Sequence, residues 1–85
     1  MKGKPLNLQL AALNNLGLMY ASGQGVELDF TEALRCYRLA AEQGVASAQS
    51  NLAVMYAHGQ GVAQDDEQAL KWYRAAAEQG LPYAQ

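Results

Sequence analysis

The chain of 85 residues has room for one small domain, and because 51% of its residues are hydrophobic it is too apolar to remain disordered. Its 6 basic and 8 acidic side chains give a net charge of −2, so there is no excess of positive charge to bind nucleic acid or an anionic membrane surface. A single cysteine and a single histidine exclude an internal disulfide and a zinc site built from clustered Cys and His residues.

No apolar run reaches about 18 residues, the length that a membrane-spanning helix requires. The leucines that follow Met1 to Lys4 are interrupted by Asn7 and Gln9, which is unlike the apolar stretch of a signal peptide. We therefore expect no membrane insertion. A cytoplasmic location is favoured, and the sequence leaves the localisation otherwise unknown.

The first expected helix begins near Leu6, because Pro5 suits a first helical turn, and it stops at Gly23. Its apolar residues recur at spacings of three and four, which predicts a buried face made of Leu6, Leu10, Leu13, Leu16, Met19 and Tyr20. The segment Gly23-Gln24-Gly25-Val26 contains two residues that take positive φ easily, and it is expected to reverse the chain.

The second expected helix starts after Asp29, which has the side chain of an N-cap residue. Glu32 stands three residues further on and is expected to reach back to the start of the helix in a capping box. The predicted buried face of this helix consists of Ala33, Leu34, Tyr37, Ala40 and Ala41. Gly44 is expected to end the helix as its C′ residue.

The same elements then return in the same order. A third helix is expected from about Ala46 to His58, with Ala48, Leu52, Met55 and Tyr56 buried, and the turn follows as Gly59-Gln60-Gly61-Val62. Asp65 and Gln68 repeat the N-cap, Gly80 repeats the helix end, and the fourth helix is expected to bury Ala69, Leu70, Tyr73, Ala76 and Ala77. Residues 81–85 restart the pattern of residues 45–49.

Residues 12–49 and 48–85, overlaid with a shift of 36, are identical at 22 of 38 positions. A period of this length is typical of solenoids, in which each unit packs on its neighbours. We predict an all-α chain that forms one domain over residues 1–85. The first unit covers about 8–44, the second about 45–80, and a third begins at 81–85.

The pattern Asn-Leu-Gly-x-Met-Tyr-x-x-Gly-x-Gly-Val-x-x-Asp, followed by Ala-Leu, Tyr-Arg and Ala-Ala-Glu-Gln-Gly, resembles the Sel1-like repeat over nearly the whole chain. The resemblance implies an α/α solenoid of helix-turn-helix units related to tetratricopeptide repeats, and a role in assembling protein complexes. It places Gly17 at a close helix crossing, which Ala53 makes slightly wider in the second unit. Val45 and Leu81 replace polar residues common in the family, which weakens the expectation of side-chain caps there.

Residues that could suggest chemistry each have a simpler structural explanation. The loop Gly23-Gln24-Gly25 follows a helix and lacks the spacing of a phosphate-binding or dinucleotide motif, which favours a turn. His58 is expected to be a solvated helix end, and residues 65–67 an acidic helix start rather than a calcium or magnesium site. Cys36 is expected to be a small buried side chain. We therefore predict no enzyme, no catalytic residue, no metal and no cofactor.

Asn15 and Asn51 are identical in both units and stand one position before a leucine. Two interpretations remain open: each amide ties its helix to a neighbouring helix, or both hold the backbone of an extended peptide. By analogy with tetratricopeptide grooves, the first helix of each unit lines a concave face. Its candidate protein-binding residues are Asn14, Asn15, Leu18, Ser22, Ser50, Asn51, Val54 and His58. The leading functional prediction is an interaction or scaffold module that binds a peptide or protein segment on this face.

A second prediction follows from the small number of units. About three units are usually needed for a stable solenoid, so the C-terminal face near Leu81, Pro82 and Tyr83 is expected to be covered. The cover is another copy in a homo-oligomer, most simply through a two-fold contact, or the rest of a longer solenoid. A remote alternative, a β-lactam hydrolase, is implied only by cysteine-rich relatives whose paired cysteines this chain lacks.

Overall fold

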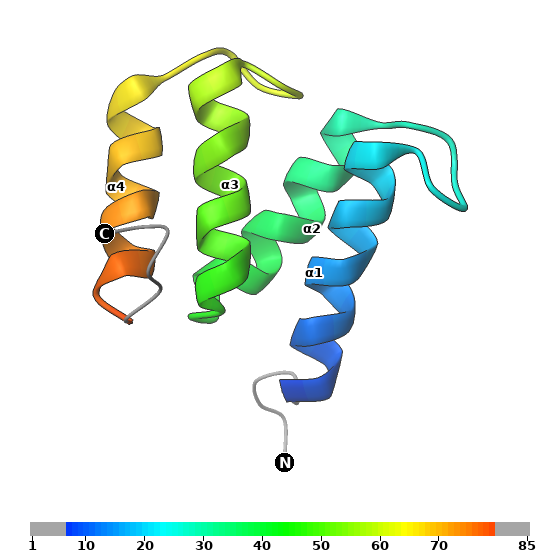
Figure 1. Cartoon of the computed structure of the whole chain (residues 1–85), viewed down its shortest axis with the longest axis horizontal. Helices are drawn as coiled ribbons and strands as arrows, with labels where there is room; N and C mark the ends of the chain where they lie inside the picture. The colour runs from blue at the N-terminus through cyan, green and yellow to red at the C-terminus, as the bar shows by residue number, and fades with distance from the viewer. Residues whose placement is uncertain (1–6, 80–85) are drawn as a thin grey trace.

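Four α-helices follow one another along the chain in the computed structural model, which describes residues 7–79. They are α1 (Asn7–Ser22), α2 (Phe30–Glu42), α3 (Ala46–His58) and α4 (Asp66–Ala77). The described residues contain no β-strand. The helices stand in a row with α1 and α4 at opposite ends (Figure 1), and the large contacts are between consecutive helices. The predicted all-α solenoid of paired helices is therefore confirmed.

Both predicted glycine turns are present and have the same geometry. Gly23 and Gly25 have φ of 73° and 80°, and the corresponding glycines of the second turn have φ of 66° and 73°. Each turn is closed by one backbone hydrogen bond, from Asp29 N to Tyr20 O or from Asp65 N to Tyr56 O, both 2.9 Å long. Glycine is needed here because positive φ is costly for a residue that carries a Cβ.

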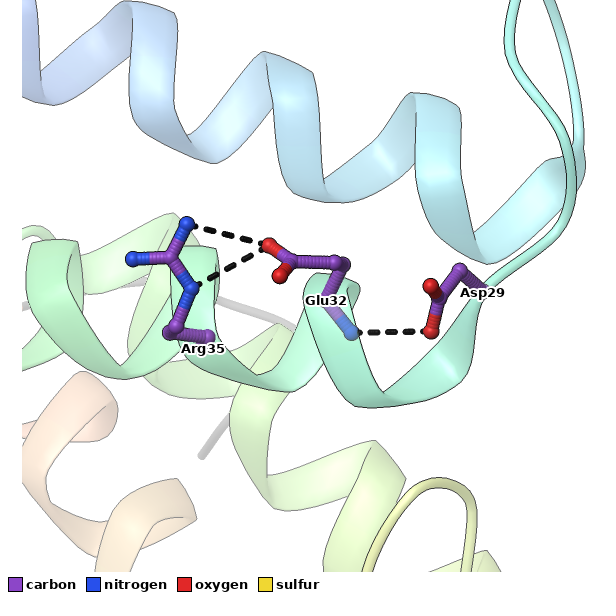
Figure 2. A network of polar contacts seen from close by, with 3 residues as sticks. All are labelled: Asp29, Glu32 and Arg35. Carbon is purple, nitrogen blue, oxygen red and sulfur yellow. Dashed lines mark hydrogen bonds and ion pairs between the residues drawn. The ribbon is translucent and has the colours of Figure 1, made fainter.

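The N-terminus of α2 is capped by Asp29, as predicted, but the capping box is incomplete. The Asp29 carboxylate accepts a hydrogen bond of 3.1 Å from the Glu32 backbone N–H. The predicted return bond from the Glu32 side chain is wrong, because the Asp29 N–H already donates to Tyr20. Glu32 instead pairs with Arg35 at 3.0 Å (Figure 2). In α4 the cap is repeated, with Asp65 accepting from Gln68 N at 3.1 Å.

The end of α2 forms the predicted glycine C-cap. Gly44 N donates to Ala41 O and Val45 N donates to Ala40 O, which is the hydrogen-bond pattern of a Schellman motif. Val45 then precedes α3 without a side-chain cap bond. The corresponding Gly80, and the predicted third unit at residues 81–85, lie outside the described residues, as does Leu6.

The core lies where α2 and α3 pack together, each with a helix on both sides. The residues predicted to be buried in α3 are all buried, and so are four of the five predicted in α2, the exception being the half-buried Leu34. Three leucine or methionine side chains predicted to be buried in the end helices are exposed instead: Leu16, Met19 and Leu70. The reason is that α1 and α4 each have a neighbouring helix on one side only among the helices of residues 7–79.

The crossing of α1 and α2 is close because Gly17 has no side chain. A Cβ at this position would lie 2.7 Å from ring carbons of Tyr37, which is itself buried. The equivalent residue in α3, Ala53, is fully buried. None of the four helices is both long and apolar enough to cross a membrane, as judged from residues 7–79.

Candidate functional site

The first helices of the two units are joined by a side-chain hydrogen bond. Asn51 Nδ2 on α3 donates to Asn14 Oδ1 on α1 over 3.1 Å, and both side chains are half-buried. The amide of Asn51 therefore ties its helix to the preceding first helix. α1 and α3 have few other contacts with each other, and both pack against α2.

Asn15 occupies the position of Asn51 in the first unit but not the same environment. Its side chain is exposed. Asn51 on α3 has the preceding first helix, α1, beside it, whereas no described first helix precedes α1. The two asparagines are thus a pair in sequence and differ in structure. Their environments differ because of the neighbouring unit, and the sequence of a single unit gives no information about that neighbour.

Side chains spaced by four residues continue from Asn14 along α1 and from Ser50 along α3. Leu18 and Ser22 are exposed on α1, and on α3 Val54 is half-buried and His58 is exposed. Ser22 Oγ donates to Leu18 O over 2.8 Å, so its hydroxyl proton is used within its own helix. We call the set of Asn14, Leu18, Ser22, Val54 and His58, together with Asn15 and Asn51, the first-helix surface.

Ser50 is the one predicted binding residue that lies in the interior. Its side chain is 2% exposed, and its Oγ has no hydrogen-bond partner. A buried hydroxyl without a partner costs free energy, typically about 1–3 kcal/mol. Ser50 is therefore not available for contact with a partner in this conformation, and it is left out of the first-helix surface.

Hydrogen bonds that the sequence did not predict hold the second unit onto the first. Gln49 Nε2 donates to Ala41 O over 3.1 Å, and Gln79 Nε2 donates to Gly44 O. Gln79 Nε2 also donates to Gln49 Oε1 within the second unit. Arg38 Nη2 on α2 donates to the hydroxyl of Tyr56 on α3. The repetition of these residues could have indicated a structural role, because Gln79 and Tyr56 have identical counterparts one period away.

Metal binding and thiol reactivity are the two kinds of chemistry considered for the side chains of residues 7–79. No three His, Cys, Asp or Glu residues of this part of the chain come together in a way that could hold a metal ion. Burial raises the pKa of the Cys36 thiol, and burial also raises the pKa of Tyr37 to about 12. Both groups stay protonated near neutral pH, so neither is an activated nucleophile.

We expect a double-mutant cycle at Asn14 and Asn51 to give a coupling free energy of about 1 kcal/mol, the usual net contribution of one hydrogen bond. The variants are Asn14→Ala, Asn51→Ala and the double variant, compared by urea unfolding. The cycle of Asn15→Ala with Asn51→Ala serves as a control, because Asn15 is exposed and no hydrogen bond joins it to Asn51. Additive losses at positions 14 and 51 would contradict a tie between the helices.

Comparisons with known proteins point in one direction. A protein-family model described as Sel1 repeat matches residues 10–45 and 46–81. The chain is similar to the crystal structure of a Sel1 repeat protein from Oxalobacter formigenes, with 47% identity over 88% of this chain and 31% of that chain and a TM-score of 0.86.

Two further solved structures have the same arrangement of helices. One is a protective antigen present in uropathogenic Escherichia coli strains and displaying an SLR fold, with 44% identity over 88% of this chain and 16% of that chain and a TM-score of 0.86. The other is Helicobacter pylori cysteine rich protein B, with 25% identity over 88% of this chain and 56% of that chain and a TM-score of 0.83. The chain thus spans less than two thirds of each of these proteins. A search of curated proteins gives no match.

Proposed function

The chain belongs to the Sel1 repeat family, and from this premise we propose that it binds an extended segment of another protein across the first-helix surface of α1 and α3. Sel1 repeat proteins generally mediate protein–protein interactions. The observation that carries the proposal for this chain is the hydrogen bond between Asn14 and Asn51. It joins side chains of two helices that belong to different repeats, which supports a surface that continues from one repeat to the next.

The side chains on this surface fit a peptide better than a small charged ligand. Leu18 and Val54 offer apolar contact. Ser22 and His58 lie at the ends of their helices: the Ser22 hydroxyl can accept a hydrogen bond from a peptide N–H, and the His58 ring can bond to the peptide backbone. None of these residues is permanently charged. An extended segment with small or apolar side chains and a free backbone is the class of ligand that we propose.

A peptide ligand can be obtained without knowing the natural partner. Peptides are selected from a random display library on the immobilised wild-type chain, and their affinity is measured by fluorescence polarisation. Leu18→Asp is expected to weaken the selected peptides at least about tenfold, because it places a charge where an apolar contact is buried on binding. Backbone amide shifts in NMR spectra should change most around Leu18, Ser22, Val54 and His58.

Leu39→Asp on α2 is a matched control, because Leu39 is 42% exposed and Leu18 is 46% exposed. This variant should keep the wild-type affinity. Shift changes that cluster on α2 and α4, or a loss of affinity in the Leu39 variant with none in the Leu18 variant, would contradict the proposed surface.

A further inference from the structure

The contact between α2 and α3 shows how one repeat of this chain receives the next. On the α3 side, Leu52 and Met55 are 0% and 2% exposed. On the α2 side, Ala41 is buried and its carbonyl oxygen accepts a hydrogen bond from Gln49, and Arg38 donates a hydrogen bond to Tyr56 across the contact. We call this contact the inter-repeat interface. It joins the second helix of one repeat to the first helix of the following one.

The half of this interface that α3 contributes is called the entering half, and α1 carries the same residues a second time. Residues of α1 are identical to the residues of α3 one period further on, at the pairs Asn15 and Asn51, Leu16 and Leu52, Met19 and Met55, and Tyr20 and Tyr56. Leu16 and Met19 are 36% and 37% exposed. The difference from α3 is that α1 has no described second helix in front of it. A shallow apolar hollow bordered by Leu16 lies on α1 as well.

The half that α2 contributes is called the receiving half, and α4 carries the same residues a second time. Its residues are identical to those of α2 one period earlier, at the pairs Leu34 and Leu70, Arg38 and Arg74, Ala40 and Ala76, and Ala41 and Ala77. Leu70 is 55% exposed, Ala77 is half-buried, and Arg74 is exposed. The chain therefore exposes both halves of an interface that it also forms internally.

We propose that a second copy of this chain occupies the α4 face, with its α1 entering as α3 enters on α2. In this arrangement Arg74 of the receiving copy donates to the Tyr20 hydroxyl of the entering copy, as Arg38 donates to Tyr56. Leu16 and Met19 of the entering copy become buried as Leu52 and Met55 are. The partner is thus defined by residues that are identical to those of a contact already formed within the chain.

This contact is head-to-tail rather than two-fold, because the surface on α1 differs from the surface on α4. Each copy keeps a free α1 or a free α4 after one contact, so the association continues into larger species or closes into a ring. Residues 80–85 stand one period after residues 44–49, with 3 of 6 positions identical, and so correspond by the period to positions 8–13 of an entering copy. The proposed contacts at positions 16, 19 and 20 come after that stretch.

Two single substitutions test the proposal in the 85-residue chain, and each of them disrupts one half of the inter-repeat interface. Leu16→Glu removes the entering face, and Leu70→Glu removes the receiving face. Wild-type mass, measured by light scattering over a concentration series, is expected to rise to at least twice the monomer mass. Each variant alone should stay monomeric. An equimolar mixture of the two should form dimers, because the α4 face of the Leu16 variant still accepts α1 of the Leu70 variant.

The mixture separates this arrangement from its alternatives. A wild-type chain that stays monomeric at every concentration would overturn the proposal, and so would a mixture that stays monomeric. A dimer of the Leu70 variant alone would show a two-fold contact through α1 and would also overturn it. Both side chains are partly exposed, so the variants should keep the helical circular dichroism of the wild type. Leu39→Glu, outside the interface, should associate as the wild type does.

The proposal is independent of peptide binding by the first-helix surface. Leu16→Glu should leave the affinity for selected peptides unchanged, and Leu18→Asp should leave the concentration-dependent mass unchanged. The failure of either proposal is therefore visible without reference to the other.

Discussion

Replacing Leu52 with alanine is expected to lower the free energy of unfolding by about 3 kcal/mol, within the usual cost of truncating a fully buried leucine. Leu52 is 0% exposed on α3, which packs against both α2 and α4. The loss combines the transfer free energy of the removed methyl groups with the cavity that they leave. Unfolding in urea, followed by circular dichroism, measures it.

Leu16→Ala is the matched control for this variant, because Leu16 holds the same position in the first repeat and is partly exposed. At concentrations where the chain is monomeric, we expect a loss of about 1 kcal/mol or less, in proportion to the smaller apolar area buried. Equal losses at the two positions would contradict the description of α3 as the centre of the core. For a domain of this size, the loss at Leu52 is a large share of the total stability.

Gly61→Ala is expected to destabilise the chain by about 3 kcal/mol, through strain at positive φ and through overlap with the neighbouring backbone. Gly61 has a φ of 73°, and a Cβ there would lie 2.5 Å from Phe30 O and 2.7 Å from Phe30 C. The turn of the second repeat rests on the start of α2, and neither atom belongs to a side chain that can rotate away. Thermal or urea unfolding gives the size of the effect.

Gly25→Ala provides the control in the first turn. Gly25 has a φ of 80°, but the nearest atom to its Cβ would be Met19 Cε at 3.1 Å, the mobile end of a partly exposed side chain. We expect a loss of about 1 kcal/mol, from the positive φ alone. Equal losses of unfolding free energy in the two alanine variants would mean that the contact between the second turn and α2 does not contribute to the cost of Gly61→Ala.

Much of the fold could be predicted from local sequence. Apolar spacing of three and four residues, Asp29 and Asp65 before the second helices, and paired glycines in the turns placed helices that the structure confirms. These signals act within about one helical turn, so a single stretch of chain contains both partners of each interaction. The family match confirms the resemblance that the repeated pattern indicated.

The predictions that were wrong depended on partners elsewhere in the chain. Glu32 has the spacing of a capping box, yet the N–H that it should reach already donates to Tyr20 O. Leu16 and Leu70 have the spacing of buried residues and are exposed, because α1 and α4 each lack a described helix on one side. Periodicity shows which face of a helix is apolar, and the neighbouring helix decides how much of that face is covered.

The candidate site likewise depends partly on the sequence pattern and partly on the neighbouring helices. Its residues could be named from the register of the repeats, and the structure leaves most of them at least partly accessible while Ser50 is buried without a hydrogen-bond partner. The bond between Asn14 and Asn51 joins residues 37 positions apart, and no pattern within one repeat contains both. Asn15, identical to Asn51 in type and position, has no described first helix before it and stays exposed.

The repeat, its period, the helices, the turns and the family are all visible in the amino-acid sequence, because they depend on residues close together in the chain. Which copy of each repeated residue is buried, which asparagine is bonded, and which two faces are exposed depend on the packing of the helices. Two similar repeats differ in these respects because they occupy different positions in the row of helices. Burial and hydrogen bonding depend on the repeat that packs beside each one.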